Sequence, residues 1–262
     1  MSHIRAKKHL GQHFLKEDHI AQRIAESLTG HGGYAHVIEV GPGTGALTTH
    51  LLARKEFALT CYEVDRESVP YLREHFPGID VREADFLRMD PTSITTGAFA
   101  VVGNFPYNIS TQIVFKVLEH RDRCTELVGM FQKEVADRIR APHGSKTYGI
   151  TSVLVQAWYD VELLFHVEPG SFIPPPKVRS SVIRMKRNTA VTLPCDEALL
   201  YRVVKTAFNQ RRKTLRNALK PLPEAIAGVP DRFADKRAEQ LSVGDFVELT
   251  MLLGTQLILP DK

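Results

Sequence analysis

Apolar positions along the first two thirds of the chain follow two periods. Short apolar runs, with the length and composition of β-strands, alternate with stretches whose apolar residues recur at helical spacing. This alternation is typical of parallel βαβ units, with helices on both faces of the sheet. The expected strands are 37–40, 58–64, 80–82, 99–103 and 127–131, and the expected helices are 20–28, 46–53, 68–75, 109–118 and 133–140.

The last strand-like stretches and the region after them depart from this order. Stretches 159–167 and 180–186 have no convincing helix between them, so we expect an antiparallel pair at a sheet edge. After Arg187 the apolar spacing is helical, and prolines break the connections. The expected helices there are 198–219, 237–241 and 243–253. The sequence therefore predicts an α/β domain over residues 1–187 and a small all-helical domain over residues 188–262.

The composition, with 43% hydrophobic and 24% charged residues, is ordinary for a soluble globular protein. Cys61, Cys124 and Cys195 lie far apart without a CxxC pair, which disfavours a disulfide framework or a zinc site. The eleven histidines lack metal-ligand spacing, so we expect no metal. No apolar run approaches the roughly 20 residues of a membrane span. We expect a cytoplasmic protein without a membrane partner, and nothing in the sequence requires more than a monomer.

A glycine-rich turn follows the first expected strand. Gly41, Gly43 and Gly45 stand in the sequence EVGPGTG, and glycine there lets the backbone approach a ligand closely. A phosphate-binding dinucleotide loop prefers GxGxxG spacing. Here the spacing is GxGxG, and the carboxylate of Glu39 beside it suits a cationic ligand better than an anionic one. A tight strand–helix turn without a ligand would have the same local sequence.

Two further acids follow the next two strands. Glu63 ends the second strand, about twenty positions after Gly41, where a carboxylate can accept both hydroxyls of a ribose. Asp85 follows the third strand and can accept from an adenine amine, beside an apolar wall that includes Phe86. Acids at successive strand ends fall along the ligand-binding edge of a doubly wound sheet. Together they resemble the S-adenosylmethionine site of class I, Rossmann-like methyltransferases, so S-adenosylmethionine is the expected cofactor.

The most informative segment is the sequence GNFPY, at 103–107, after the fourth strand. An adenine amine is a poor nucleophile because its lone pair is delocalised into the ring. The side-chain carbonyl of Asn104 and a backbone carbonyl held by Pro106 can accept its two N–H groups and aim the lone pair at a sulfonium methyl. Tyr107, after Phe105 and Pro106, can stack on the purine. An Asn-Pro turn with a packed aromatic residue is the structural alternative.

Basic residues are concentrated after Ala198. Between Ala198 and Pro223 the chain has seven of them and no acidic residue. A solvated helix face normally mixes both signs, so this bias favours phosphate binding, which adds affinity and salt dependence but reads little sequence. If this region is one helix, Lys205, Arg212, Arg216 and Lys220 fall near one of its faces. The candidate RNA-binding residues are Lys205, Arg211, Arg212, Lys213, Arg216 and Lys220.

The chain closely resembles the bacterial small-subunit (16S) ribosomal RNA adenine N6,N6-dimethyltransferase family, ahead of the erythromycin-resistance methylases. The resemblance runs along nearly the whole chain. Besides GNFPY, it rests on KHLGQHFL at 8–15, QKEVA at 132–136, FIPPPKV at 172–178 and FNQRRKTLRN at 208–217. The family's first motif usually reads GQNFL, so His13 replaces the usual asparagine, and an imidazole can still donate or accept a hydrogen bond.

The resemblance implies roles for these residues. It implies that Phe172 sandwiches the target adenine against Tyr107, and that the C-terminal domain binds ribosomal RNA. The implied product is N6,N6-dimethyladenosine at two adjacent adenines near the 3′ end of small-subunit RNA, during subunit maturation. The implied or expected cofactor-binding residues are His13, Leu15, Gly41, Gly43, Gly45, Glu63, Asp85, Phe86 and Asn104.

Three other functions compete with this hypothesis. DNA adenine methyltransferases usually carry a proline where Phe105 stands, and they lack a counterpart to the basic C-terminal helices. An assembly factor could bind RNA and use its cofactor pocket only as a checkpoint, although the intact segment from Asn104 to Tyr107 disfavours a loss of catalysis. A nicotinamide-dependent oxidoreductase would need phosphate-binding glycine spacing and a catalytic Tyr/Lys or His constellation, neither of which is evident.

Overall fold

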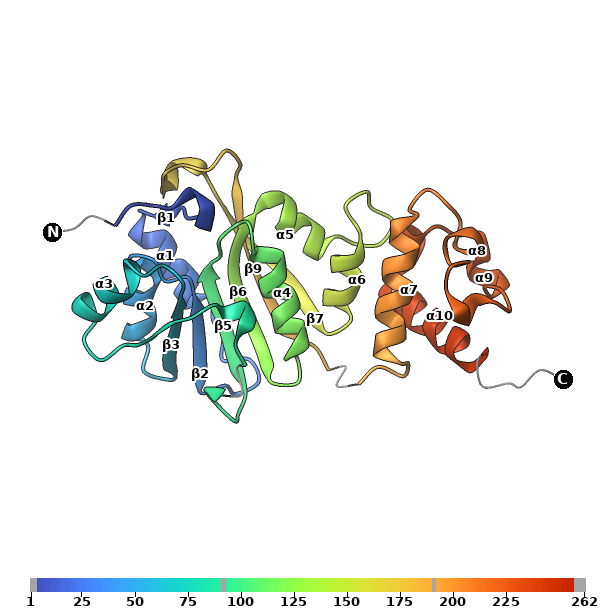
Figure 1. The fold of residues 1–262 in the computed structure, drawn as a ribbon, viewed down its shortest axis with the longest axis horizontal. Helices are drawn as coiled ribbons and strands as arrows, with labels where there is room; N and C mark the ends of the chain where they lie inside the picture. The colour runs from blue at the N-terminus through green and yellow to red at the C-terminus, as the bar shows by residue number, and fades with distance from the viewer. Residues whose placement is uncertain (1–3, 91–92, 190–191, 257–262) are drawn as a thin grey trace. The chain divides into compact units, whose positions relative to one another are not determined.

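The computed structural model describes residues 4–90, 93–189 and 192–256, so the outermost residues of both predicted domains lie outside the described ranges. Within these ranges a seven-stranded sheet has the order β4-β3-β2-β5-β6-β9-β7 (Figure 1). Its strands are β2 (His36–Val40), β3 (Ala58–Glu63), β4 (Asp80–Glu83), β5 (Phe99–Asn104), β6 (Cys124–Gln132), β7 (Tyr159–Val167) and β9 (Ser180–Arg187).

The sheet is parallel from β4 to β6, and β9 then runs antiparallel to β6. The predicted fold class, a mostly parallel sheet of Rossmann-like type, is therefore confirmed. Strands β3 and β4 extend the sheet on one side of β2, whereas β5 and β6 extend it on the other. The strand order therefore reverses between β2 and β5, which is the switch point of the sheet. In such sheets the carboxyl ends of the two strands at the switch point form a ligand-binding crevice.

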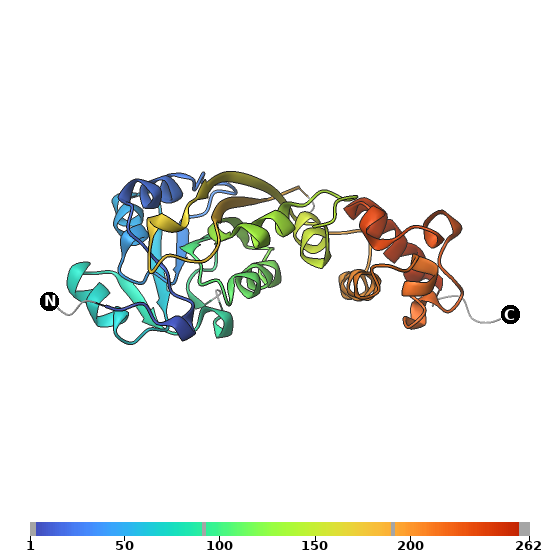
Figure 2. The same cartoon turned by 90° about the horizontal axis from the view of Figure 1, so that it is seen from above.

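Helices cover both faces of the sheet, because apolar side chains of each strand point alternately to either side. Val37 and its register partner Leu59 face the side on which α1 (Asp18–Glu26) and α2 (Ala46–Ala53) pack. Cys61 continues that face towards α3 (Ser68–His75). The opposite face is covered by α4 (Ser110–Glu119), which lies in front of β5 and β6 in Figure 1 and is drawn from above in Figure 2.

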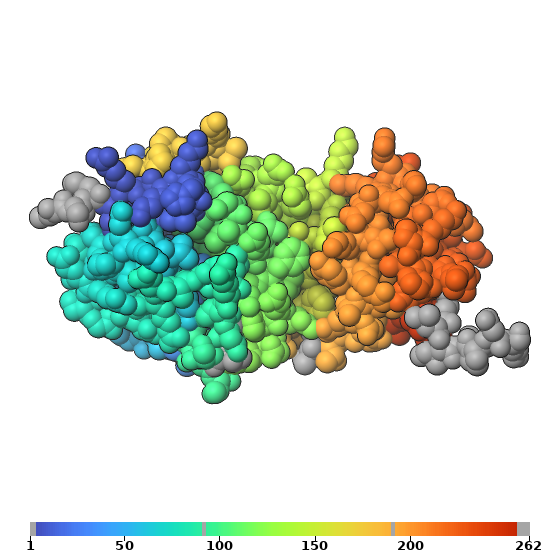
Figure 3. Space-filling model, in the orientation of Figure 1, coloured from blue at the N-terminus to red at the C-terminus, as the bar shows by residue number. Residues whose placement is uncertain are grey.

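A second, two-stranded sheet joins the N-terminal motif to the proline-rich segment, and the sequence did not predict it. β1 (Phe14–Leu15) pairs antiparallel with β8 (Phe172–Ile173), so that Leu15 lies opposite Phe172. Strands of two residues have too few positions for a periodic signal. Figure 3 shows the consequence on the surface, where the blue N-terminal segment lies beside the yellow segment near residue 172.

By its internal contacts the chain divides into two compact units. One comprises Met1–Ala136 with Asp160–Arg187, and the other comprises Asp137–Tyr159 with Asn188–Lys262. The chain leaves the first unit for the last time at residue 187, where the sequence placed the domain boundary. The sequence assigned Asp137–Tyr159 to the first domain, whereas its contacts are with the helical unit. This segment contains α6 (Ile150–Gln156), a helix for which we had no prediction.

The helical unit is built around aromatic and aliphatic side chains. Phe208 lies between two other rings, with centroids 5.9 Å from Tyr148 and 5.8 Å from Phe246. Besides α6, the helical unit contains α7 (Glu197–Asn209), α8 (Leu215–Ala218), α9 (Asp231–Ala234) and α10 (Val243–Gln256). The helix α5 (Lys133–Arg140) begins in the first unit and ends in the helical unit.

One predicted element of this unit is wrong. The expected continuous helix over 198–219 is two helices, because α7 ends at Asn209 and the chain turns before α8. Thr214 is extended, and the N–H of Leu215 donates to the carbonyl of Lys236 at 2.8 Å, which fixes α8 against a different segment. The basic residues therefore do not share one face of a single helix.

Among the described residues, no helix has both the length and the apolar character needed to cross a membrane.

Candidate active site

The turn between β2 and α2 requires glycine. Gly41, Gly43 and Gly45 have φ of 72°, 58° and 83°, in the left-handed region that favours glycine. A Cβ on Gly43 would lie 2.8 Å from the ring of Phe14, so this glycine also permits a close approach by the N-terminal segment. A Cβ on Gly45 would lie 2.3 Å from Phe76. Gly45 therefore serves the packing of α2 and is not among the described residues that line the main cavity.

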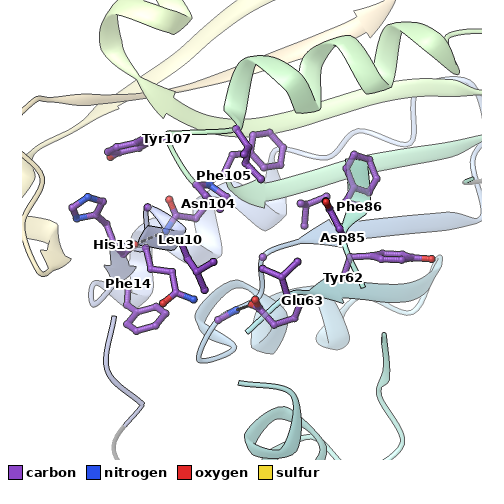
Figure 4. Close-up of a pocket in the computed structure, with 18 of the residues that line it drawn as sticks. Leu10, His13, Phe14, Tyr62, Glu63, Asp85, Phe86, Asn104, Phe105 and Tyr107 are labelled. Carbon is purple, nitrogen blue, oxygen red and sulfur yellow. Dashed lines mark hydrogen bonds between the residues drawn. The ribbon is translucent and has the colours of Figure 1, made fainter. Parts of the chain in front are cut away.

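The main cavity opens at the carboxyl ends of β2 to β5 and has about 660 Å³ of space, including solvent at its open mouth (Figure 4). Most of the predicted cofactor residues line it, from four strand ends and from the N-terminal segment. They are His13, Gly41, Gly43, Glu63, Asp85, Phe86 and Asn104. The sequence did not single out several other lining residues. These are Leu10, Gly11, Gln12, Phe14, Val40, Tyr62, Val64, Ala84 and Ile109.

Glu63, at the end of β3, projects into this cavity with only 3% of its surface exposed. Its Oε2 accepts the N–H of Gly43 at 3.0 Å, and its Oε1 accepts the N–H of Asp65 at 2.8 Å. Burial raises the pKa of Glu63, and these two backbone hydrogen bonds oppose the rise. Each oxygen keeps a lone pair, so the carboxylate can accept further hydrogen bonds from a ligand.

Asp85 and Phe86 lie at the start of a short turn after β4. Oδ1 of Asp85 caps that turn by accepting the N–H of Leu87 at 2.9 Å. The ring of Phe86 is buried and meets the ring of Tyr62 edge-on, with centroids 6.2 Å apart. An acid beside an apolar wall is the arrangement that the sequence predicted for a purine. Tyr62 adds to that wall, and its signal in the sequence was only its place one residue before Glu63.

Asn104 ends β5 with a defined amide orientation. Its Nδ2 donates to the backbone carbonyl of His13 at 2.8 Å, drawn as a dashed line in Figure 4. Because the nitrogen is used in this way, the side-chain oxygen is the atom left to accept a hydrogen bond in the cavity. Pro106 packs against the glycine turn, because a Cβ added to Gly41 would lie only 3.6 Å from the ring of Pro106. This packing stiffens the segment that carries Asn104.

The two aromatic residues of the GNFPY segment have different surroundings. Phe105 is buried and packs edge-on against Phe131, with ring centroids 5.2 Å apart, so it anchors the segment to the sheet. Tyr107 shares a hydrogen bond of 2.5 Å with Oγ of Ser180, from the start of β9. Burial raises the pKa of Tyr107, and the hydrogen bond with Ser180 opposes the rise. Tyr107 is therefore held as a neutral ring beside the cavity.

The structure differs from the expected arrangement at Phe172. The resemblance placed this ring opposite Tyr107, but its side chain is 2% exposed and lies in the core cluster that includes Leu15. The cause is the pairing of β1 with β8, which turns Phe172 inward. Instead, the imidazole of His13 stacks on Tyr107, with centroids 5.2 Å apart and planes inclined by 29°.

Leu15 lies beneath the glycine turn and not in the main cavity. It is buried, and with Glu39 it lines a smaller cavity under Gly41 and Gly43. Glu39 is 1% exposed and accepts the hydroxyl of Thr48 at 2.7 Å. Burial raises the pKa of Glu39 from 4.5 to about 7. The sequence suggested this carboxylate for a cationic ligand beside the turn, but its hydrogen bonds are to Thr48 and Cys61 within the fold.

A second, wider cavity adjoins the main one and has about 1070 Å³ of space by the same measure. The two share lining residues of the N-terminal segment, together with Tyr107. The outer wall of the second cavity is the proline-rich segment 174–178, and Lys8 and Lys177 both line it and are exposed. Two positive charges therefore line the cavity that Tyr107 also lines.

Acids from other segments lie next to several basic residues of the helical unit. Arg211 lies 3.5 Å from Glu239, and Arg216 lies 3.3 Å from Asp235. Lys205 lies over the ring of Tyr201, 5.7 Å from its centroid. In the part of the chain that the structure describes, the remaining candidates have no acidic partner at ion-pair distance and are exposed. They are Arg212, Lys213 and Lys220.

The fold and the strand-end site together define a class I methyltransferase. The chain matches the model of the family described as ribosomal RNA adenine dimethylase over residues 3–253. It is 53% identical over 255 residues to the ribosomal RNA small subunit methyltransferase A of Cytophaga hutchinsonii, covering 97% of this chain and 99% of that protein. The chain therefore belongs to the ribosomal RNA adenine dimethylase family, whose methyl donor is S-adenosylmethionine.

Solved structures agree with this fold. A dimethyladenosine transferase from Plasmodium falciparum superposes with a TM-score of 0.79 at 23% identity, covering 93% of this chain and 98% of that one. The 23S rRNA methyltransferase ErmE superposes with a TM-score of 0.67 at 26% identity, covering 90% and 99%. The unmatched share of the chain is smaller than the predicted helical C-terminal part in both cases, so both matches extend into that part.

Proposed function

We propose that this enzyme transfers methyl groups from S-adenosylmethionine to N6 of two adjacent adenines near the 3′ end of small-subunit ribosomal RNA, giving N6,N6-dimethyladenosine. The observation that carries the proposal is the oriented amide of Asn104 at the switch point, with its nitrogen bound to the carbonyl of His13. The small-subunit substrate follows the name of the Cytophaga relative. With that substrate we infer action in the cytoplasm, by a monomer, during subunit maturation.

The described residues fit the cofactor. Glu63 offers two oxygens to ribose hydroxyls, and Asp85 with Phe86 offers an acceptor and an apolar wall to the adenine. Gly41 and Gly43 expose backbone at the end nearest Asn104. When bound, the cofactor supplies an electrophilic methyl group on a sulfonium. Leu15 and Gly45 do not line the main cavity, and they support the site by packing beneath the glycine turn.

The chain's own residues would position the adenine. Oδ1 of Asn104 accepts one N–H of the amine, and the backbone carbonyl in the segment stiffened by Pro106 accepts the other, which localises the lone pair on N6. Phe105 anchors this segment, and Tyr107 stacks on the ring. An amine buried in a stacked helix cannot reach this site, so the base enters flipped out of the RNA.

The RNA backbone would contact the helical unit. Arg212, Lys213 and Lys220 are exposed cations without acidic partners among the described residues, so they are the strongest phosphate ligands. Lys205 is also exposed, whereas Arg211 and Arg216 each lie near an acid that competes for the guanidinium. These contacts add affinity without reading bases.

Methyl transfer to small ribosomal subunits lacking these modifications tests the proposal. The purified chain is incubated with tritiated S-adenosylmethionine and such subunits, and the labelled nucleosides of the digested RNA are identified. We expect the label in N6,N6-dimethyladenosine at two adjacent positions. If the cofactor binds and no label enters the RNA, the proposed function is wrong, and an RNA-binding assembly role becomes the better explanation.

A further inference from the structure

Two glycines lie opposite each other at the centre of the main sheet. Gly103 of β5 and Gly129 of β6 are register partners, and neither is among the glycines with positive φ. The backbone conformation of Gly129 is therefore open to any residue. A glycine inside a strand has no side chain to pack, and it often marks a site that another group approaches closely. Here the approaching group is an aromatic ring.

The ring of Phe105 fills the space in which side chains at these two positions would lie. A Cβ on Gly129 would lie 2.2 Å from Cε2 of Phe105, and a Cβ on Gly103 would lie 2.7 Å from Cε1 of the same ring. Phe105 is 1% exposed, and the ring of Phe131 meets it edge-on. The two glycines and Phe131 thus form a closely fitting seat for Phe105, which we call the ring seat.

The ring seat holds the segment that carries the proposed chemistry. Asn104 and Pro106 are the direct neighbours of Phe105 in the chain, and Tyr107 follows. Figure 4 shows the side chains of Asn104 and Phe105 leaving the segment in different directions. The hydrogen bond to His13 orients the amide of Asn104, whereas the seated ring fixes the backbone from which that amide projects. Both are needed to place Oδ1 of Asn104 in the cavity.

We propose that Gly129 is a positioning residue for methyl transfer, which seats Phe105 and thereby fixes Asn104 beside the cofactor. The inference rests on the proposed function and deepens it, since Gly129 is not among the residues that line the main cavity or the second one. Gly103 contributes to the same seat, but its Cβ would also lie 2.6 Å from the carbonyl oxygen of Val40. Substitution of Gly129 is therefore the cleaner test.

A methyl group at position 129 would displace the ring of Phe105. Ordinary contacts of a Cβ begin near 3.4 Å, whereas the ring atom lies at 2.2 Å. The ring would have to withdraw by roughly 1 Å, and a misplacement of that size can reduce a rate about 10²-fold. Phe131, whose ring would lie 2.9 Å from the same Cβ, blocks one direction of withdrawal. The displacement is therefore transmitted to the chain on either side of Phe105.

Steady-state methylation of small subunits by variants of the full chain tests the proposal. We expect Gly129→Ala to lower kcat about 10²-fold. The KM for subunits and the dissociation constant of S-adenosylmethionine should change little, because Gly129 lines neither cavity. Gly97→Ala, in the same unit, is the matched control and should behave as wild type, since its Cβ would lie 3.8 Å from the nearest atom.

A double substitution shows whether the effect passes through the ring. Phe105→Val removes the ring atoms that the methyl group of alanine would meet. In a chain that already carries Phe105→Val, Gly129→Ala should therefore lower kcat by only about threefold, and this non-additivity is expected of residues in direct contact. If Gly129→Ala alone does not fold, the double variant should still fold, because the obstructing ring is absent.

Four results would overturn the proposal. A kcat near the wild-type value in Gly129→Ala would mean that the ring moves without moving Asn104. Equal losses with and without Phe105→Val, or a double variant that does not fold, would mean that the ring is not the obstruction. Easier unfolding of Gly129→Ala in urea, with wild-type turnover by the folded fraction, would restrict Gly129 to a role in stability.

An NMR measurement separates this inference from the proposed function. The side-chain amide resonances of Asn104 are recorded without RNA, and we expect Gly129→Ala to shift them and Gly97→Ala to leave them unchanged. If they shift while the wild-type chain never methylates ribosomal RNA, the proposed function fails and the role of the ring seat stands. If the wild-type chain methylates the RNA and these resonances are the same in Gly129→Ala, the Gly129 proposal fails alone.

Discussion

Two side chains of the GNFPY segment owe their orientation to partners that are distant in the sequence. Asn104 donates to the carbonyl of His13, and Tyr107 is hydrogen-bonded to Ser180. Each bond removes a rotational freedom that a substrate would otherwise have to restrict. Pre-organised groups of this kind contribute to the rate of a reaction more than to the affinity for its substrate.

Replacing Asn104 by alanine tests that division. The proposed acceptor for the N6 amine is lost, so we expect kcat to fall by roughly 10²-fold or more. RNA affinity should change little, because contacts to phosphate supply most of it. Label incorporation into small subunits and filter binding of the same RNA measure the two quantities. Near wild-type turnover in this variant would contradict the role of Asn104.

Glu39 is a second residue whose surroundings determine its chemistry. It is enclosed beneath the glycine turn, where burial raises its pKa from 4.5 to about 7. Between these values the folded protein keeps a proton that the unfolded chain releases. Stability should therefore decrease as pH rises through this interval, by about 3 kcal/mol in total.

Glu39→Gln should remove this pH dependence. Urea unfolding of both proteins between pH 5 and pH 8 gives the free energy of unfolding at each pH. We expect the difference between wild type and variant to shift in favour of the variant as pH rises. Glu74→Gln, at an exposed carboxylate, serves as the control. Parallel curves for wild type and Glu39→Gln would show that Glu39 does not titrate in this range.

At the scale of elements, the N-terminal segment is held over the main cavity by an ion pair. Nζ of Lys7 lies 2.5 Å from Oδ1 of Asp65, and Nε2 of Gln12 lies 3.2 Å from Oδ2 of the same carboxylate. Burial alone would raise the pKa of Asp65, but these partners outweigh it and lower the pKa. The N–H of Asp65 also donates to Glu63. The segment and the proposed ribose-binding carboxylate are thus connected through one residue.

Lys7→Met should loosen this segment. We expect a several-fold weaker affinity for S-adenosylmethionine, mainly through faster dissociation, because residues between Lys7 and Phe14 cover the cavity. Stopped-flow dissociation and calorimetry provide the measurements. Lys16→Met, on the same segment but exposed, controls for the lost charge. Equal dissociation rates in the two variants would exclude a role for the ion pair with Asp65.

At the scale of the whole molecule, the distribution of charge differs from its sequence pattern. Acids from other segments neutralise part of the basic run after Ala198, as in the pairs of Arg211 with Glu239 and Arg216 with Asp235. Exposed ion pairs of this kind are weak, so Arg211 and Arg216 can still bind phosphate after their ion pairs with the acids break. Arg212 and Lys213, which have no acidic partner among the described residues, should dominate.

The double substitution Arg212→Glu with Lys213→Glu should weaken RNA binding and flatten its salt dependence. Each lost phosphate contact lowers the slope of log K against log salt by roughly 0.7 to 0.9. Binding isotherms from 50 to 300 mM salt measure that slope. Lys16→Glu with Lys55→Glu makes the same change in net charge in the other unit. Equal slopes in the two double variants would mean that net charge, and not this site, governs affinity.

The sequence by itself determined the seven strands of the main sheet, the helices α1 to α5, the glycine turn and the polar residues at successive strand ends. These features are local, because apolar period, turn chemistry and residue type are all read within a few positions. The convergence of Gly41, Glu63, Asp85 and Asn104 in one cavity then followed from the geometry of parallel strands. The family's motifs added the expectation of an adenine substrate.

Only the tertiary structure decided which side chains meet across the fold. The contacts of Lys7 with Asp65, His13 with Tyr107 and Leu15 with Phe172 join residues far apart in the chain. No local pattern encodes them, so the sequence did not predict that His13 stacks on Tyr107 or that Phe172 packs against Leu15. The break between α7 and α8 has the same origin, because a long-range hydrogen bond from Leu215 outweighs a helical spacing that the sequence alone supports.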